Sequence, residues 1–181
     1  MIDDTDRDLL PEGLGDRLPR ETAAMARAVR ASLDVMDAHG YDRVEPPVIE
    51  FEKSMASRME GVRPRRMFRF VDPANLRTLA LRSDMTVQVG RIAATGLASA
   101  ARPLRLCYSG TVVTIKAEAL DPARERLQIG AELIGSDSVA AAAEVVTLAI
   151  EALAAAGARG ISVDFTLPDL VDTLAQKALP L

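Results

Sequence analysis

Two short polar stretches of this 181-residue chain have the residue types and spacing needed to bind a small charged molecule. In "LRSDMT", Asp84 and Thr86 come between a strand pattern and a helix pattern. A carboxylate and a hydroxyl are therefore expected beside the free N–H groups of a first helical turn. In "LQIGAELIG", Gln128 and Glu132 fall on one face of a predicted strand, about 13 Å apart by strand rise. Simple helix capping and a solvent-facing sheet surface are the alternative interpretations.

These four side chains suit a small zwitterion, because a carboxylate accepts hydrogen bonds from an ammonium group while Gln and Thr bond its polar remainder. The chain has a single histidine and a single cysteine, too few for a Cys/His metal cluster, and the one histidine is not predicted to serve a Ser-His-Asp triad. His39 in "DAHGY" is expected at a helix C-terminus, and Cys107 in "LRLCY" is expected in the core. The glycines of "PEGLGD" form no P-loop. We therefore expect a binding site without catalytic residues, metal or cofactor.

Arginines are the remaining candidates for ligand or partner contacts. One cluster in "RPRRMFRF" is interpreted either as a solvated loop and strand edge or as an anion or partner contact; it contains Arg63, Arg65, Arg66 and Arg69. A second, dispersed set either contacts anions or coats the surface; it consists of Arg82, Arg105, Arg124 and Arg126.

The overall composition narrows the class of protein. A net charge of −4 argues against nucleic-acid binding, for which a basic face is expected. No stretch approaches the roughly 20 apolar residues of a membrane-spanning helix, and the acidic first residues do not resemble a secretory signal. A lone cysteine permits no internal disulfide, which fits a reducing compartment. We expect a cytoplasmic protein that binds neither nucleic acid nor membrane.

Hydrophobic periodicity predicts the elements that position these residues. Apolar residues at helical spacing predict a helix over 20–38. "YDRVEPPVIE" predicts one short strand at an edge or interface, because Pro46 and Pro47 cannot donate to a ladder. "RMFRFVD" and "RTLALRS" predict a hairpin around the turn "PAN". "SDMTVQVGRIAATG" predicts a helix with Ser83 or Asp84 as its N-cap.

The second half of the chain continues the pattern. "PLRLCYSGTVVTI" and "ERLQIGAELIG" predict two strands, and "SVAAAAEVVTLAIEALAAAG" predicts a helix capped by Ser138 and ended by Gly157. "GISVDFTL" predicts another strand, followed by a helix with Pro168 in its first turn. Together these elements predict an α+β fold, a mainly antiparallel sheet with helices on one side. Residues 1–181 are expected to form a single domain, the N-terminal part of a longer chain.

The same stretches, taken in order, resemble the catalytic core of class II aminoacyl-tRNA synthetases of the histidyl branch. "LPEGLGDRLPRE" is similar to the segment before their first motif, and "GYDRVEPPVIEFEKSM" looks like that motif. "FRFVDPANLRTLALRSDMT" resembles their hairpin and "LRPEGT" substrate segment, and "RLCYSGTVVTIKAE…ERLQIGAELIGSDS" resembles the second motif. The resemblance covers essentially the whole chain. It implies an antiparallel sheet flanked by helices, with Pro47 at a dimer interface.

The departures from the synthetase pattern fall in the ATP site. The second motif of the synthetases carries "FRxE", whose Arg holds the α-phosphate of ATP. Counted from Gly110, this chain has Thr114 in place of that Arg and Lys116 in place of the Glu. Thr cannot form the bidentate contact that Arg makes with a phosphate. The resemblance therefore implies that adenylate formation is lost or severely impaired.

The positions that resemble the histidine contacts of the synthetases persist better. Asp84 replaces a Glu, whereas Thr86, Gln128 and Glu132 match the pattern. The resemblance thus implies a site that keeps the amino-acid contacts and lacks the ATP contacts.

This combination resembles one family of synthetase-like proteins, the regulatory subunits of ATP phosphoribosyltransferase, to which "LCYSGTV", "LQIGAELIGSDS" and "TLPDLVDTLAQKALPL" are similar. The resemblance implies a non-catalytic, self-dimerising subunit. It would assemble with a catalytic ATP phosphoribosyltransferase subunit, activate this first step of histidine biosynthesis, and transmit feedback inhibition with histidine as effector. Two alternatives remain open: a histidyl-tRNA synthetase or a fragment of one, and a ligand-free dimerisation module of the same fold.

Overall fold

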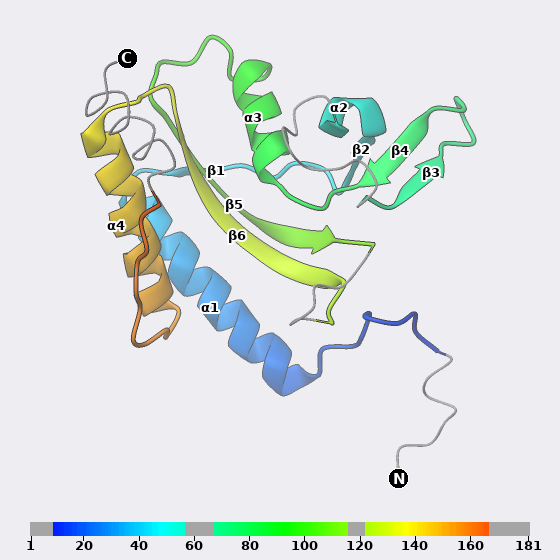
Figure 1. The fold of residues 1–181 in the computed structure, drawn as a ribbon, viewed down its shortest axis with the longest axis horizontal. Helices are drawn as coiled ribbons and strands as arrows, with labels where there is room; N and C mark the ends of the chain where they lie inside the picture. Colours follow the sequence, from blue (N-terminus) through cyan, green and yellow to red (C-terminus); the bar gives the residue numbers. More distant parts are fainter. Residues whose placement is uncertain (1–8, 57–66, 116–121, 167–181) are drawn as a thin grey trace, which may run out of the picture.

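A computed structural model describes residues 9–56, 67–115 and 122–166, and three of the clustered arginines (63, 65 and 66) lie outside these ranges. Figure 1 shows a curved two-stranded ribbon with helices on both sides and a smaller sheet extending from one end. The elements are α1 (Pro19–Ala38), β1 (Asp42–Arg43), β2 (Ile49–Phe51), α2 (Glu52–Ala56), β3 (Arg69–Val71), β4 (Thr78–Leu81), α3 (Thr86–Ala94), β5 (Leu104–Val113), β6 (Glu125–Ile134) and α4 (Val139–Ala155).

The long antiparallel ribbon of β5 and β6 is the centre of the fold. The two strands pair along their full length, from Leu104 opposite Ile134 to Val113 opposite Glu125. β1 adds a short parallel pairing to β5, which gives a three-stranded sheet of order β1-β5-β6. The predicted pair of strands is confirmed. Side chains on the ribbon alternate between its two faces, so each face can meet a different set of helices.

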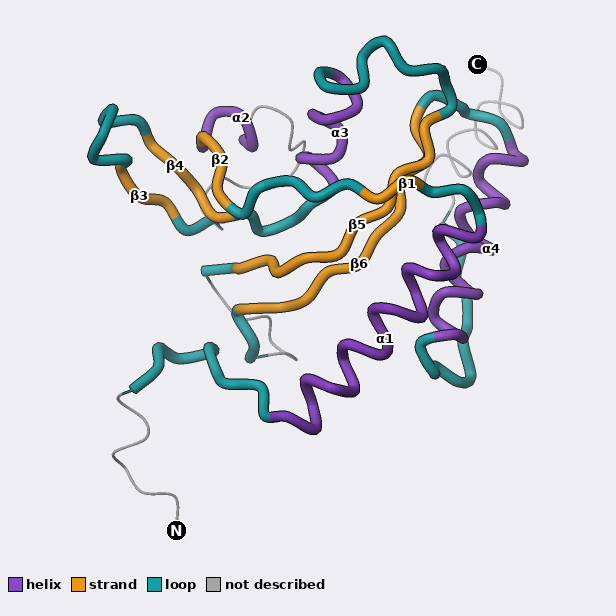
Figure 2. The backbone as a smooth tube through the Cα atoms, turned by 180° about the vertical axis from the view of Figure 1, so that it is seen from behind, coloured by secondary structure: helices purple, strands orange, loops and turns teal. Residues whose placement is uncertain are grey.

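Helices cover both faces of the ribbon, so the prediction of helices on one side is wrong. On one face, Leu106 and Tyr108 of β5 pack against Met85 and the first turns of α3. On the other face, Cys107 packs between α1 and α4, where it is buried as expected. Figure 2 shows α1 and α4 together on one side of β5–β6 and α3 on the other. The successive apolar residues Leu106, Cys107 and Tyr108 already indicate this in the sequence, because a strand with such a run is buried on both faces.

A second, smaller sheet has the order β2-β4-β3 and is antiparallel throughout. The predicted hairpin is confirmed, and the carboxylate of Asp72 holds its turn by accepting from the Ala74 N–H and the Asn75 amide. The single strand predicted for "YDRVEPPVIE" is wrong. It divides into β1 and β2, which belong to different sheets, and Pro46 and Pro47 lie between them because neither can donate to a ladder.

The helix ends follow the predicted chemistry in two of three cases. α1 ends at the C-cap His39, and Gly40 follows with φ of +78°. The Ser138 hydroxyl caps α4 by accepting from the Ala141 N–H at 3.2 Å. The predicted cap of α3 differs in position, because its N-cap residue is Met85, but the Asp84 carboxylate does accept from the N–H of Thr86, the first residue of the helix, at 2.8 Å.

The last predicted elements are not borne out where the structure describes them. Residues 161–166 form no strand, and the helix expected from Pro168 lies outside the described ranges.

An ion pair ties α4 to β5. The Arg105 guanidinium donates to both carboxylate oxygens of Glu144, at 2.6 and 2.8 Å, and the Tyr41 hydroxyl donates to the same carboxylate at 3.0 Å. The hydrogen bond from Arg105 lowers the pKa of Glu144 from its usual value to about 2. A lowered pKa of this kind stabilises the fold at any pH where the carboxylate of the unfolded chain is already ionised.

This pKa shift predicts a defined pH dependence. The Glu144 carboxylate should contribute its full stabilisation above about pH 4.5 and lose it as the pH falls towards about 2. A Glu144→Gln variant should therefore be less stable than the unaltered protein at pH 7, and the difference should vanish near pH 2. Urea unfolding at a series of pH values measures it, with the exposed Glu21→Gln on α1 as the control. A gap that stays constant down to pH 2 would contradict the assignment.

Candidate ligand-binding site

Arg82 positions the segment that carries the first two candidate residues. Its guanidinium is almost completely buried, and it donates to the Thr111 carbonyl at 2.7 Å and to the Pro46 carbonyl at 2.8 Å. Its backbone N–H donates to Val48, and its carbonyl accepts from Val113. Burial lowers the pKa of this guanidinium, although the nearby charge of Glu45 opposes the shift. Arg82 therefore joins β4 to β5, and it is a structural clamp rather than a surface charge.

The segment after Arg82 brings Asp84 onto Gln128. Oδ2 of Asp84 accepts from the Gln128 amide nitrogen at 2.8 Å, and Oδ1 accepts from the Thr86 N–H at 2.8 Å. The Gln128 amide oxygen accepts from the Met85 N–H at 2.9 Å. These three bonds fix the orientation of both side chains at the start of α3. Asp84 is therefore more than a helix cap, because its carboxylate bonds both to the start of α3 and to Gln128 of β6.

Tyr108 connects the other two candidates, and sequence reasoning missed it. Its hydroxyl donates to Oε1 of Glu132 at 3.1 Å and lies 3.1 Å from Oγ1 of Thr86. Burial raises the pKa of Tyr108 to about 12, and the charge of Glu132 adds to the shift. The hydroxyl therefore stays protonated at neutral pH. All four predicted site residues thus meet on the face of the ribbon that α3 covers, in two hydrogen-bonded groups.

The geometry gives this surface a defined polarity. A tyrosine hydroxyl has one proton, and the proton of Tyr108 is donated to Glu132, so the bond to Thr86 is donated by the threonine. Thr86 then offers only lone pairs to a further group. The carboxylates of Asp84 and Glu132 are also acceptors when ionised. An arrangement of acceptors suits a ligand rich in N–H donors, as an ammonium group or a protonated nitrogen ring is.

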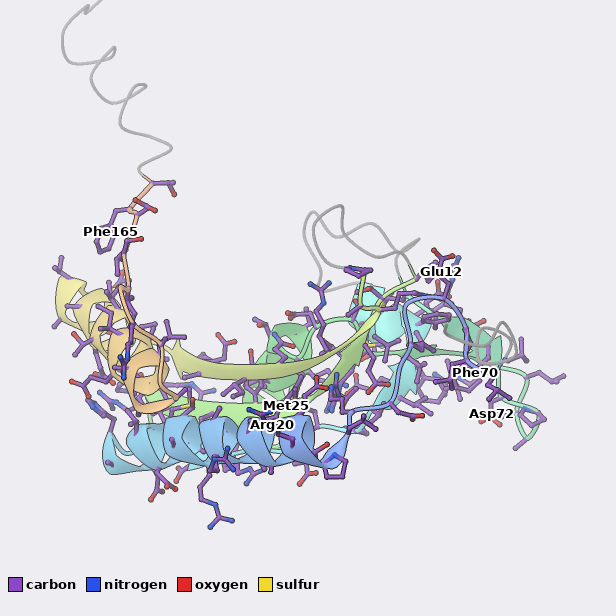
Figure 3. The ribbon with its side chains drawn as sticks, turned by 90° about the horizontal axis from the view of Figure 1, so that it is seen from below. Glu12, Arg20, Met25, Phe70, Asp72 and Phe165 are labelled. Carbon is purple, nitrogen blue, oxygen red and sulfur yellow. The ribbon has the colours of Figure 1, made fainter. Side chains whose placement is uncertain are left out.

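The end of the ribbon, where the synthetase pattern places its ATP-binding Arg, is organised differently. Thr114 follows β5, and its N–H donates to the Arg124 carbonyl at 2.8 Å. In the other direction, Nε of Arg124 donates to the Thr114 carbonyl. Another nitrogen of the same guanidinium donates to the Glu12 carbonyl at 3.0 Å. Figure 3 labels Glu12 beside this end of the ribbon. The guanidinium lies over the Phe68 ring, so it is committed to protein contacts. Lys116 lies outside the described residues.

The remaining arginine candidates also have protein partners. Arg105 pairs with Glu144, and Arg69 pairs with Glu52 at 2.7 Å. Arg126, on the first half of β6, likewise has an interaction partner. Arg69 of the clustered set is therefore an exposed strand residue with a local ion pair.

A hollow lies elsewhere, on the α1 face of the ribbon. This open groove of about 720 Å³ lies between α1 and Leu127 of β6, and Arg17, Arg30 and Arg43 line its edges. Leu127 points to the face opposite to Gln128, since neighbouring strand residues alternate. The groove is separate from the four predicted residues, and among its arginines Arg17 is paired with Glu125.

Comparison with known proteins shows the family of this chain. The family model described as histidyl-tRNA synthetase matches residues 13–180. The chain belongs to this family. A Bacillus halodurans structure described as an ATP phosphoribosyltransferase regulatory subunit/histidyl-tRNA synthetase aligns with a TM-score of 0.83 at 29% identity, covering 94% of this chain and 43% of that one. Apo histidyl-tRNA synthetase of S. aureus aligns with a TM-score of 0.64 at 24% identity, over 82% of this chain and 34% of its own, which supports the fold alone.

Curated members of the family are closer in sequence. A Rhodospirillum centenum protein named ATP phosphoribosyltransferase regulatory subunit is 46% identical over 93% of this chain and 44% of its own length. One with the same name from Paramagnetospirillum magneticum is 46% identical over 94% of this chain and 45% of its own. The chain thus spans a little under half the length of these relatives. The predicted class II synthetase-like α+β fold is confirmed.

No helix in the described ranges is long and apolar enough to cross a membrane.

The clamp predicts that Arg82 cannot be replaced by another cation. Lys has one ammonium group and cannot reproduce the fork that reaches both the Pro46 and Thr111 carbonyls. Arg82→Lys should lower the free energy of unfolding by about 2 kcal/mol, the contribution of a buried hydrogen bond from a charged group. Chemical denaturation measures the change, with the exposed Arg27→Lys on α1 as the matched control. Equal stability of the two variants would show that the clamp contributes little.

Proposed function

We propose that this chain is part of the regulatory subunit of ATP phosphoribosyltransferase, which acts in the first step of histidine biosynthesis. It would bind the catalytic subunit, activate it, and transmit inhibition by histidine without catalysing a reaction itself. The names of the closely similar relatives support the regulatory role. Because the chain spans less than half of those relatives, the proposed activity is that of the complete protein.

The observation that carries the proposal is the contrast between the two parts of the ribbon. In the middle, Asp84, Thr86, Gln128 and Glu132 form a connected, acceptor-rich surface. At the end, Thr114 occupies the position where the synthetases have an Arg for ATP, and a neighbouring guanidinium is held by backbone carbonyls. A surface that favours an amino acid and has Thr in place of the phosphate-binding Arg suits binding of histidine as an effector better than adenylate formation.

Histidine would fit the acceptor arrangement through its two nitrogen-bearing ends. The α-ammonium group would donate to the Asp84 carboxylate and to Thr86, beside the amide of Gln128. The imidazole N–H would donate to Glu132, farther along the same strand face. Strand rise separates Gln128 from Glu132 by about 13 Å, so the two side chains address different parts of the ligand.

Histidyl-tRNA synthetase activity is the second candidate. The description of the matching family model favours it, and the Bacillus halodurans structure carries both descriptions. The loss of the Arg at position 114 argues against it, because Thr offers a phosphate no positive charge. Formation of histidyl-adenylate by the complete protein would decide for this candidate.

We also propose that the protein forms a self-dimer through the region of Pro47 and the small sheet. Ile49, Phe70 and Leu79 share one face of that sheet, and the first two are about 40% exposed. The Pro47 carbonyl accepts from the buried Gln88 amide, whose own oxygen has no partner among the described residues. An exposed apolar sheet face suits a protein interface.

Two further attributes belong to the proposal. Residues 1–181 would form one synthetase-like core domain, and the protein would act in the cytoplasm, where a free, buried Cys107 stays reduced.

The proposed function predicts a gain of activity in a reconstituted complex. Adding the complete protein to a cognate short-form catalytic subunit should raise the rate of ATP phosphoribosyltransferase and make that rate sensitive to histidine. An Asp84→Asn complex should need about tenfold more histidine for the same inhibition, because one charged hydrogen-bond acceptor is lost. The exposed Asp34→Asn on α1 is the matched control. Unchanged rate and histidine sensitivity after mixing would refute the regulatory role.

The proposed dimer predicts an effect that is specific to one sheet face. Phe70→Glu places a charge on the apolar face of β3 and should convert the dimer to a monomer in sedimentation experiments. Val71→Glu changes the neighbouring residue, which is 57% exposed and points to the other face, and should leave the dimer intact. Figure 3 shows Phe70 on this hairpin, distant from α1 and α4. Equal behaviour of the two variants would place the interface elsewhere.

A further inference from the structure

We propose that Tyr108 is the positioning residue of the ligand site and sets its selectivity for the imidazole ring. The inference rests on the proposed binding of histidine and adds a residue outside the four predicted from the sequence. Tyr108 is a positioning residue and not a catalytic one. It would act through Glu132 and Thr86, whose hydrogen bonds it holds.

The strand opposite Tyr108 is shaped to receive its ring. Tyr108 pairs with Gly130 across the ribbon. A Cβ atom at Gly130 would overlap with the ring carbon Cζ and the hydroxyl oxygen of Tyr108. The ring therefore lies flat on the backbone of β6, in a space that only glycine provides. This geometry directs the hydroxyl along β6 towards Glu132, two residues beyond the glycine.

The hydroxyl then fixes two properties of the site at once. By donating to Oε1 of Glu132, it orients the carboxylate and leaves Oε2 for a donor on the ligand. By accepting from Thr86, it keeps the threonine lone pairs available to an ammonium group. The ring is almost fully buried among Met85, Val89 and Leu106, so the hydroxyl has little freedom to move.

A second buried tyrosine provides an internal comparison. Tyr41 is equally buried, its hydroxyl donates to Glu144 at 3.0 Å, and its pKa is likewise raised to about 12, chiefly by burial. It packs with Cys107 and α4 on the opposite face of the ribbon. Tyr41 therefore has the chemistry of Tyr108 without contact to the ligand site, and substitution of its hydroxyl reports the purely structural effect.

The test measures selectivity in addition to affinity. Binding of L-histidine and of its two ring N-methyl derivatives is measured by calorimetry with the complete protein in complex with the catalytic subunit. In the unaltered protein, methylation of the nitrogen that faces Glu132 removes a hydrogen bond and should weaken binding. In Tyr108→Phe the carboxylate loses its orientation, so the preference for histidine over that derivative should fall about tenfold, the value of one hydrogen bond to a charged group. Tyr41→Phe should keep the preference.

A second variant tests the glycine. Gly130→Ala should displace the Tyr108 ring and reduce the preference in the same way while every hydroxyl of the site is still present. Gly90→Ala in α3, where an added Cβ meets nothing within 4 Å, is its control. Thermal unfolding of all four variants separates loss of selectivity from loss of stability.

The outcomes separate the two levels of the proposal. If the unaltered protein does not bind histidine, the proposed function fails and this inference fails with it. If it binds histidine and Tyr108→Phe keeps the unaltered preference, or Tyr41→Phe loses it equally, the positioning role alone is refuted. Loss of the preference in Tyr108→Phe and Gly130→Ala, with both controls unchanged, supports it.

Discussion

The buried guanidinium of Arg82 is the contact on which the two sheets and the site jointly depend. A cation removed from water is stable only where it is closely hydrogen-bonded, so the Pro46 and Thr111 carbonyls must stay in place around it. Those carbonyls belong to the link before β2 and to β5, which are otherwise distant in the chain. A methyl group at Gly110 would collide with the guanidinium, so the strand beneath it must also be free of a side chain. These contacts of Arg82 also fix the position of Asp84, which lies two residues further along the chain.

Two glycines on opposite strands then determine how polar groups lie on the ribbon. Gly110 pairs with Gln128, and Tyr108 pairs with Gly130, so each of these neighbouring pairs combines one glycine with one large polar side chain. The Tyr108 ring can lie flat across the sheet because its partner position has no side chain. Arg82 covers the first glycine and Tyr108 covers the second. The result is a hydrogen-bonded layer between the ribbon and α3, where ordinary strand residues would have formed a purely apolar contact.

The sequence was sufficient for the long elements and for the residue types of the site, because periodicity and polarity are local properties. It failed where distant parts of the chain decide the structure. Nothing local shows that Asp42 and Arg43 pair with β5, more than sixty residues away, so one strand was expected where two exist. The sequence predicted Asp84 in the ligand site but not its bond to Gln128, because that bond is a tertiary contact to β6. Tyr108 was missed because a tyrosine in an apolar run resembles core, and only the register with Gly130 distinguishes it.

The central hydrogen-bonded layer and the Thr114 end of the ribbon lie far enough apart for residues of one to change without affecting the other. Tyr108 and Thr114 are six residues apart, which corresponds to about 20 Å of strand. The hydrogen bonds of the central layer close among α3, β5 and β6, whereas Thr114 is bound to the Arg124 side chain and backbone beside the N-terminal segment. The hydrogen bonds described above for these two regions have no residue in common. Under the proposed function, replacement of a phosphate-binding Arg at the end of the ribbon would therefore leave the acceptor arrangement in its middle undisturbed. A synthetase core would in this way lose a reaction and retain a sensor.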